Sequence, residues 1–380
     1  MKRHFLFIGA IVLLFIIAIS CQKAVEIGLI GQNSEEEKNP VVETPKAIKQ
    51  LEFSKMMPLA DERIYSVAVA DFNKDGYDDI VAGVYTEYSE IFMNNKDGTF
   101  EKNPVILKKY NTQVIAIIDF NNDGNKDLIL GNNQQPIVLL KNNGDNSFSL
   151  YKELDRTIVN DIAVADFDNN GFEDFIIATQ FKENYVYFNS NGEFEKVKIS
   201  DFLDNMPAKS VSAADFNNDN YVDFVMGMDM RTSKVYINDK NKKFTMAAEL
   251  PGLAHTYDIA IFDSDKDGNL DILQGNNKEQ SMIFLNKNGF TGSPAFGSGN
   301  TYTVLAADFD NDGEKEVVIG DYEINTKIYR KINNEYSLLK EIETPERDFV
   351  RSLAAGDFNG DGYLDLVIGR EKSMSAVYVS

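Results

Sequence analysis

The chain has 380 residues, of which 60 are acidic and 38 are basic, so its formal charge is −22. This balance argues against a nucleic-acid-binding protein, which needs a basic face. A content of 43% hydrophobic and 11% aromatic residues argues against a disordered acidic chain. One cysteine and two histidines exclude a disulfide framework, a C-x-x-C pair and a histidine-rich metal site.

Residues 1–20 have the pattern of a secretory signal. Lys2 and Arg3 form a positive start, and an almost unbroken apolar run follows over residues 5–19. This run is shorter than the roughly 20 residues that span a bilayer. A cleaved signal is therefore favoured, and a transmembrane anchor is the alternative.

The sequence AISC, which ends at Cys21, resembles the cleavage site of bacterial lipoproteins. We therefore expect acyl chains on Cys21, and several chains on one residue give stable membrane attachment. Gln22, directly after the cysteine, favours the outer membrane of a bacterial cell envelope. Residues 21–49 contain few apolar side chains and two prolines, which predicts a flexible tether and not a domain.

The remainder of the chain, residues 50–380, repeats itself at intervals of 45 to 49 residues. Repetition at such a period is typical of solenoids, propellers and arrays. Each repeat contains one nine-residue acidic pattern, and we number the repeats 1 to 7 by these patterns. The seven patterns start at Asp71, Asp119, Asp166, Asp215, Asp263, Asp308 and Asp357.

Each repeat has the pattern of four short strands. In repeat 1, the small and β-branched run 67–70 leads into the acidic loop, the apolar runs 80–82 and 91–93 follow it, and a fourth run begins near Phe100. Such runs between glycine- and asparagine-rich turns are strand signals, and no long helical period occurs after residue 50. The pattern predicts an all-β fold, a seven-bladed β-propeller of four-stranded blades. An open β-solenoid is the alternative.

The two ends of the repeating region complement one another. Repeat 7 stops at Ser380 after its third strand, whereas residues 51–55 stand before repeat 1 like a fourth strand without a sheet. We expect residues 51–55 to complete the seventh blade. A ring closed in this way leaves fewer free strand edges than an open array.

The acidic loop reads Asp-x-Asp/Asn-x-Asp/Asn-Gly-x-x-Asp. Oxygen ligands at positions 1, 3, 5 and 9, with the backbone carbonyl at position 7, suit a hard cation of calcium size, and the glycine at position 6 permits the sharp turn. Asn220 replaces this glycine in repeat 4 and can adopt the same left-handed conformation. Glu316 is longer than aspartate, so the sixth site is expected to be shifted or weaker. The predicted ligands are Asp71, Asn73, Asp75, Tyr77, Asp79, Asp119, Asn121, Asp123, Asn125, Asp127, Asp166, Asp168, Asn170, Phe172, Asp174, Asp215, Asn217, Asp219, Tyr221, Asp223, Asp263, Asp265, Asp267, Asn269, Asp271, Asp308, Asp310, Asp312, Glu314, Glu316, Asp357, Asn359, Asp361, Tyr363 and Asp365.

Asp, Asn and Gly also make good turns, so a metal-free acidic turn is the alternative for any single loop. Seven copies at one place in a repeat favour metal. The ligand positions hold 23 of the 60 acids, and the remaining 37 nearly match the 38 bases. The acidity of the chain is therefore mostly metal-site acidity, and we expect up to seven Ca²⁺ ions, one for each repeat.

These loops and their flanking strands resemble the FG-GAP/VCBS repeat family, whose relatives include the propeller of integrin α-subunits. The resemblance covers residues 50–380 in all seven repeats. It implies calcium in the loops that join the first and second strands of each blade, and it implies that these loops share one face. It also implies that ligands meet the opposite face, as they do in many relatives. Repeat 5 departs from the pattern, since Ser264 follows the first aspartate where phenylalanine is usual.

The opposite face is expected to consist of the loops before each first strand and those between the second and third strands. Aromatic side chains among amides and charges suit sugars or protein surfaces, and ordinary loop composition is the alternative for any single residue. His255 is more typical of a loop or packing histidine than of a catalyst. The candidate ligand-face residues are Arg63, Tyr88, Arg156, Phe181, Arg231, His255, Tyr257, Tyr322 and Arg351.

These features predict a calcium-stabilised, membrane-anchored binding or adhesion module that recognises a protein or glycan partner at the cell envelope. A scaffold within an envelope complex is the second possibility. A polysaccharide-active enzyme is the third, although the sequence contains neither a phosphate-binding loop nor a nucleophile–histidine motif, so we expect no catalytic residues. The loops after the second strands differ among repeats, which favours an asymmetric partner over a sevenfold lectin.

Overall fold

The computed structural model describes residues 50–380, except positions 54, 61–62, 105–107, 181–182, 200–206, 253, 288, 294–295, 298, 323–324 and 344–347. The predicted signal, Cys21, the predicted tether and Phe181 lie outside the described residues. The described residues belong to one compact unit, Lys46–Ser380. They form strands and no helix, so none of them lies in a helix that could cross a membrane.

The strands follow the predicted repeat closely. They are β1 (Lys55–Ala60), β2 (Ile64–Ala70), β3 (Asp79–Val84), β4 (Glu90–Asn94), β5 (Phe100–Pro104), β6 (Thr112–Ile118), β7 (Asp127–Asn142), β8 (Phe148–Ala165), β9 (Asp174–Thr179), β10 (Tyr185–Ser190), β11 (Glu193–Lys198), β12 (Ala208–Ala214), β13 (Asp223–Arg231), β14 (Lys234–Asn238), β15 (Phe244–Glu249), β16 (Ala254–Phe262), β17 (Asp271–Asn276), β18 (Met282–Asn286), β19 (Phe290–Gly292), β20 (Thr301–Ala307), β21 (Glu316–Asp321), β22 (Thr326–Ile332), β23 (Glu335–Ile342), β24 (Val350–Gly356), β25 (Asp365–Arg370) and β26 (Ser375–Val379).

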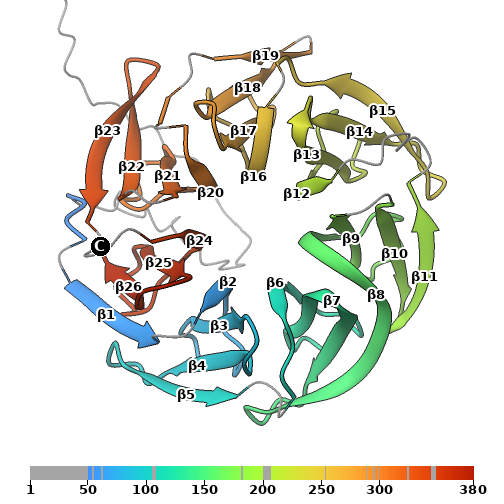
Figure 1. Ribbon diagram of the computed structural model, residues 1–380, viewed down its shortest axis with the longest axis vertical. Coiled ribbons are helices and arrows are strands. Elements are labelled where there is room, and N and C mark those ends of the chain that lie inside the picture. The colour runs from blue at the N-terminus through green and yellow to red at the C-terminus, as the bar shows by residue number, and fades with distance from the viewer. Residues whose placement is uncertain are drawn as a thin grey trace, which may run out of the picture. The chain divides into compact units, whose positions relative to one another are not determined.

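The strands of this unit are arranged around a central axis, and the chain runs once around it (Figure 1). Repeat 1 forms the antiparallel sheet β2-β3-β4-β5, and repeat 6 forms β20-β21-β22-β23. Repeats 2 and 3 share the sheet β11-β10-β9-β8-β7-β6. Repeats 4 and 5 share the sheet β15-β14-β13-β16-β17-β18-β19, in which β12 also pairs with β13. In each repeat the first strand lies nearest the axis.

Repeats share sheets where one long strand serves two of them. Residues 127–132 of β7 pair with β6, and residues 138–142 pair with β8, so β7 supplies the second and third strands of repeat 2. Strand β8 continues from the outer edge of repeat 2 to the axial strand of repeat 3, where it pairs with β9 (Figure 1). The chain therefore forms an all-β, propeller-like fold.

Close packing between repeats explains the glycine that follows each second strand's apolar run. The second strands, such as β3 and β9, are buried along their whole length because neighbouring repeats cover both faces. A Cβ atom at Gly131 would lie 2.5 Å from Val114 Cγ1 and 2.8 Å from Val159 Cγ1, closer than carbon atoms can approach. Glycine thus lets the first strand of the next repeat approach, and only Ala178 of repeat 3 replaces it.

The two ends of the repeating region meet in the sheet of repeat 7. Strand β1 pairs antiparallel with β26, which gives the order β1-β26-β25-β24. The predicted position of this strand at residues 51–55 is wrong, because β1 occupies Lys55–Ala60. The backbone of Phe53 is left-handed, with φ of +43°, and its ring packs at 5.5 Å on Phe309 of repeat 6. Phe53 therefore holds the expected aromatic position, but strand pairing starts after it.

Aromatic pairs of this kind join consecutive repeats. In five of the seven repeats, the phenylalanine after the first loop aspartate meets, edge to face, the aromatic residue near the start of the next fourth strand. Phe120 of repeat 2 instead stacks on Tyr151 at 4.5 Å. Ser264 lacks the ring for this contact, and Tyr336 of repeat 6 instead stacks on Phe296 at 5.3 Å. The pairs are Phe72–Phe148, Phe167–Phe244, Phe216–Phe290, Phe309–Phe53 and Phe358–Phe100.

Candidate metal centres and the opposite face

The acidic loops join first strands to second strands and share one hydrogen-bonding pattern. Asp71 Oδ1 accepts a bond from the Asp75 amide at 3.0 Å, and its Oδ2 accepts one from the Gly76 amide at 2.8 Å. The equivalent pair of bonds recurs in repeats 2 to 7. Asn220 has φ of +66°, which confirms that asparagine takes the glycine conformation in repeat 4.

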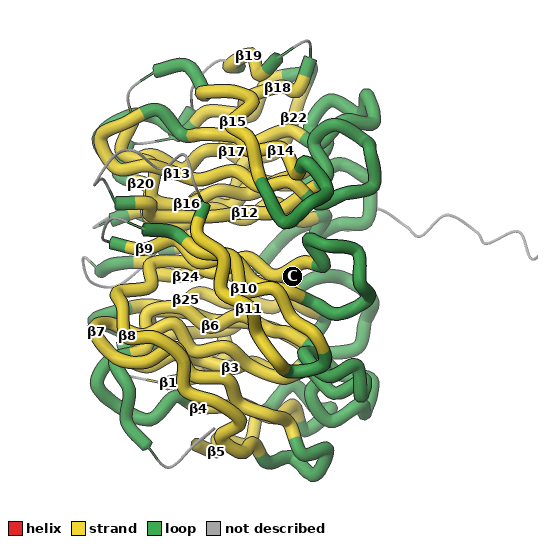
Figure 2. Tube along the Cα trace, turned by 90° about the vertical axis from the view of Figure 1, so that its right-hand side faces the viewer, coloured by secondary structure: helices red, strands yellow, loops and turns green. Residues whose placement is uncertain are grey.

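All of these loops emerge at the same end of the sheets, because they follow the same strand of each antiparallel repeat. Figure 2 shows loops gathered at the two ends of the strands. The position-7 residue of every loop donates its amide to the side chain at position 5. These donors are Tyr77, Asn125, Phe172, Tyr221, Asn269, Glu314 and Tyr363.

The carboxyl group at position 9 is buried and ties the loop to the sheet. Asp79 is fully buried, its Oδ2 accepts a bond from the Phe72 amide at 3.0 Å, and its Oδ1 accepts one from the Asn94 amide at 2.8 Å. Burial is the largest cause that raises the pKa of these groups, backbone hydrogen bonds oppose it, and neighbouring loop carboxylates raise the pKa further. The pKa rises to about 6 for Asp79, Asp223 and Asp365, and to about 7 for Asp127 and Asp174.

Several loops bring carboxylate oxygens close enough together to bind a cation. In repeats 3, 5 and 6, three carboxylates bring one oxygen each within 4.8 Å of one another. Asp127 Oδ2 and Asp168 Oδ1 are buried without a hydrogen-bond partner, and an orphaned buried carboxylate oxygen is costly unless a cation meets it. These oxygen ligands fit calcium. The ligand assignments made from the sequence nevertheless stay predictions.

In repeat 6 an arginine side chain neutralises two of the loop carboxylates. Arg330 Nε donates to Glu316 Oε1 at 2.9 Å, and Arg330 Nη2 forms an ion pair with Asp310 Oδ2. Both carboxylates are fully buried. A guanidinium from the third strand thus reaches ligand positions 3 and 9, where the other loops present no arginine. The asparagine position of repeat 6 holds Lys331, whose Nζ donates to Ser264 O, and Arg330 stands one residue before it. The two departures at the carboxylates, Glu316 for aspartate and an arginine at position 330, belong together.

An asparagine that was not predicted from the sequence as a site residue ends the third strand of repeats 1 to 5. Asn142 is buried, and its Nδ2 donates to Phe72 O of repeat 1 at 2.9 Å and to Lys126 O at 3.2 Å. This amide group joins one acidic loop to the loop before it. The recurrence of Asn some 15 residues after position 9 was the available signal. The equivalent residues are Asn94, Asn142, Asn189, Asn238 and Asn286.

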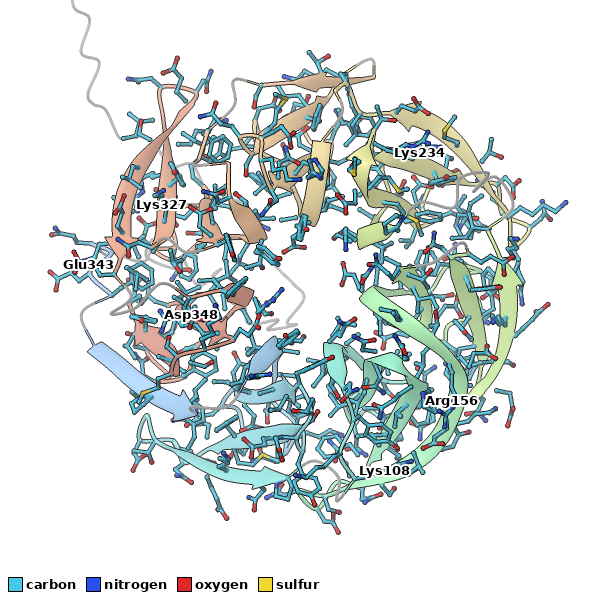
Figure 3. The ribbon with its side chains drawn as sticks, in the orientation of Figure 1. Lys108, Arg156, Lys234, Lys327, Glu343 and Asp348 are labelled. Atoms are coloured by element: carbon cyan, nitrogen blue, oxygen red, sulfur yellow. The ribbon has the colours of Figure 1, made fainter. Side chains whose placement is uncertain are left out.

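The candidate ligand-face residues divide into a central and a peripheral group. Tyr257, Tyr322 and Arg351 lie in one aromatic cluster around the axis, described below. Arg156 lies on the outer side of the ring (Figure 3). His255 Nδ1 lies 2.6 Å from Asp229 Oδ1, a hydrogen bond within the chain. Arg63, Tyr88 and Arg231 are exposed.

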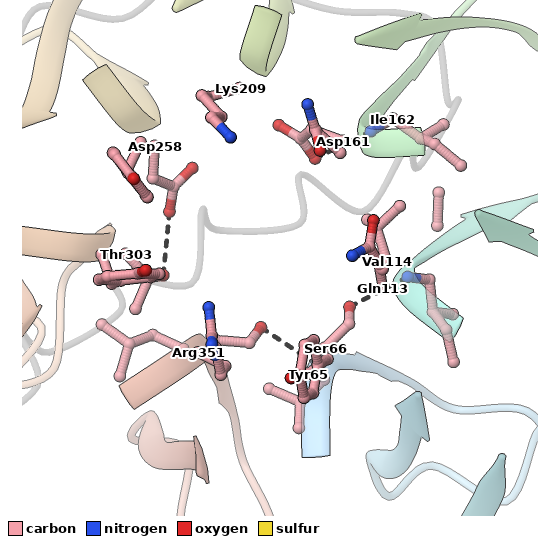
Figure 4. A pocket seen from close by; sticks show the side chains of 18 of the residues that line it. Tyr65, Ser66, Gln113, Val114, Asp161, Ile162, Lys209, Asp258, Thr303 and Arg351 are labelled. Carbon is pink, nitrogen blue, oxygen red and sulfur yellow. Dashed lines mark hydrogen bonds between the residues drawn. The ribbon is translucent and has the colours of Figure 1, made fainter. Parts of the chain in front are cut away.

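The axial mouth is the opening on this face, at the start of the first strands. One residue from each repeat, six positions before the first loop aspartate, surrounds it, and the cavity beneath has a volume of about 410 Å³ (Figure 4). Arg351 is central, with its guanidinium carbon 4.7 Å from the Tyr65 ring centroid and 4.8 Å from that of Tyr302. The seven residues are Tyr65, Gln113, Asn160, Lys209, Tyr257, Tyr302 and Arg351.

The chain belongs to the FG-GAP-like repeat family, whose model matches residues 71–130, 119–177, 166–226, 215–274, 263–319 and 308–368. No curated protein matches the chain. Its fold is similar to crystal structures of BBS1N in complex with ARL6DN, one soaked with lead and one with mercury. The TM-scores are 0.63 and 0.62 and the sequence identities 11% and 10%, over 86% of this chain and 96% of that chain in both cases. At this identity the likeness is one of fold.

Proposed function

We propose that this protein is a calcium-stabilised, seven-bladed propeller that binds a protein partner at the bacterial cell envelope, to which an acylated Cys21 anchors it. The contrast between its two faces carries the proposal. On one face the same loop recurs in every repeat, which suits a structural role. On the other face, seven equivalent positions hold five residue types, which suits one asymmetric partner.

Calcium would be held by loop positions 1, 3, 5 and 9, with the carbonyl at position 7. The ion would supply positive charge among three or four carboxylates, which otherwise repel one another. It would also link the loop to the second strand, which begins with position 9, because that side chain already accepts bonds from the loop and from the third strand. The expected result is a rigid opposite face.

A protein partner is favoured over a glycan by two observations. The rings at the axial mouth pack on one another and on Arg351, so few flat faces remain for sugar stacking. In addition, a similar fold occurs in BBS1N, which was crystallised in complex with ARL6DN. A scaffold that joins several envelope proteins is the alternative, and it differs only in the number of partners.

Capture of envelope proteins by the full-length, calcium-loaded protein tests this function. We expect a distinct partner that Tyr257→Ala at the axial mouth loses and Tyr363→Ala on the loop face retains. Chelation should release the partner from the wild-type protein. Equal capture by both variants, or loss only with Tyr363→Ala, would place the binding surface elsewhere.

The anchor is tested separately. Cys21→Ser should shift the protein from the membrane fraction to the soluble fraction or block its maturation, because the acyl chains have no other attachment site. A control substitution, Gln22→Ser, should leave the fractionation unchanged. Membrane retention of the Cys21→Ser protein after cleavage of its leader would contradict lipid attachment at Cys21.

A further inference from the structure

The axial mouth contains two cations in different situations. Arg351 is neutralised from within the chain, because it forms an ion pair with Glu371 and lies among the rings of Tyr65, Tyr302 and Phe349. A cationic group of a partner would meet this guanidinium and be repelled. The aromatic cluster is therefore closed to cations.

Lys209 lacks such a counter-ion. Its ammonium donates to Gln180 Oε1 at 3.0 Å and lies 5.5 Å from the ring centroid of Tyr257. Among the residues that the structure describes, Lys209 forms no ion pair, although its side chain is half-buried at the mouth (Figure 4). Burial lowers the pKa of Lys209, and the repulsion of Arg351 lowers it further, whereas the attraction of Asp229 opposes both. An anion beside it would relieve this cost.

Gln113, from repeat 2, adds a second unsatisfied group to the same cavity. Its Oε1 atom is buried without a hydrogen-bond partner, and its side chain lines the mouth together with Lys209. A buried acceptor that lacks a donor costs free energy. A ligand with an N–H or O–H group would satisfy it.

The acids beneath the mouth are already engaged. Asp161 Oδ2 accepts bonds from Ser210 Oγ and the Val211 amide, both at 2.9 Å. Asp258 Oδ2 accepts bonds from Thr303 Oγ1 and the Val304 amide, both at 2.9 Å. These carboxyl groups join neighbouring first strands and leave Lys209 free to meet a ligand from outside.

We propose that the axial mouth binds an acidic peptide segment of the protein partner, with a carboxylate on the Lys209 ammonium and a backbone N–H on Gln113 Oε1. The segment enters from the face opposite the acidic loops. This assignment rests on the proposed function, since it places the contact of a protein partner. A uronic-acid sugar is disfavoured, because Tyr65 is covered by Tyr85 at 4.8 Å on one side and by Arg351 on the other.

A blocked tripeptide, acetyl-Gly-Asp-Gly-amide, is the first probe, and its Asn counterpart and glucuronate are the comparisons. Full-length protein in detergent with calcium is titrated with each probe, with ligand-observed NMR as the readout. We expect the Asp peptide to bind about tenfold more tightly than the Asn peptide, because truncating one partner of a desolvated charge pair costs at least that much. Equal affinity for the two peptides would overturn the proposal, and tighter binding of glucuronate would replace it with a sugar site.

Variants locate the interaction. Lys209→Met keeps the aliphatic stem and should weaken the Asp peptide about tenfold, whereas Lys209→Arg should retain most of the affinity. Lys152→Met is the matched control, because Lys152 lies on the outer part of strand β8 and pairs with Glu193 of β11. An unchanged affinity in Lys209→Met, with a normal melting curve, would refute the site. If Lys209→Met still captures the envelope partner, the peptide site fails and the proposed function stands; if the wild-type protein captures none, the proposed function fails.

Discussion

The sixth loop allows a direct test of how these loops are neutralised. The double variant Glu316→Asp/Arg330→Asn restores the position-9 aspartate of the other repeats and replaces the guanidinium with a neutral side chain, and no other repeat has an arginine at the position of Arg330. Wild-type Arg330 neutralises Asp310 and Glu316, which are fully buried. Removing one partner of a buried pair costs about 3–5 kcal/mol. The lower value applies here, because 25% of the Arg330 side chain is exposed.

In chelator, the double variant should therefore unfold with a free energy about 3 kcal/mol lower than that of the wild type. In calcium, the new site should restore about 2.7 kcal/mol when the free ion exceeds its dissociation constant a hundredfold. The variant thus gains a calcium response that the wild-type sixth loop lacks. Urea unfolding with calcium and with chelator, together with the bound calcium per chain, measures both effects.

Arg63→Asn is the control, since Arg63 is exposed on the opposite face. It should change neither the calcium count nor the calcium response. The reasoning is refuted if the double variant binds no additional ion, or if the wild-type protein already fills its sixth loop.

Two further predictions concern contacts away from the metal ligands. Asn142→Ala should lower the free energy of unfolding by about 1–3 kcal/mol, because it leaves the buried carbonyl of Phe72 without a donor. Asn143→Ala, at an exposed neighbour, should cost under about 0.5 kcal/mol, and equal melting of the two variants would contradict the link between repeats. Burial, and then the neighbouring Asp258, raise the pKa of Asp161 to about 7, so the charged form destabilises the native state and stability is lost as pH rises from about 4 through 7. Asp161→Ser introduces the residue that repeats 1, 4 and 7 have at this position. The free energy of unfolding of this variant, relative to that of the wild type, should rise between pH 5 and pH 8. A difference in unfolding free energy that does not change with pH would contradict this.

Much of the fold could be predicted because the same local sequence pattern recurs in every repeat. The spacing of the acidic loops, the alternation of apolar runs and the incomplete last repeat are all local patterns, and they led to the all-β assignment and to pairing between the chain ends. The position of β1 was missed by about four residues. An aromatic residue usually opens the fourth strand, but Phe53 adopts a left-handed backbone that delays pairing, and sequence does not reveal this.

The site was predicted less completely, because its contacts join residues far apart in the chain. Asn142 contacts Phe72 across 70 positions, so its role appears only when repeats are stacked. Arg330 was not noticed beside Glu316, because the two meet only through strand pairing in repeat 6. The grouping of Lys209, Gln113 and Arg351 at one mouth likewise follows from their equivalent positions on separate first strands, a relation that loop composition does not show.

The number of calcium ions bound by the purified full-length protein tests the central claim most directly. With every loop occupied except the arginine-neutralised sixth, elemental analysis should find about six ions per chain, and chelation should lower the melting temperature. Fewer than about three ions per chain, or a melting curve that does not respond to chelator, would contradict the account and leave these loops as acidic turns.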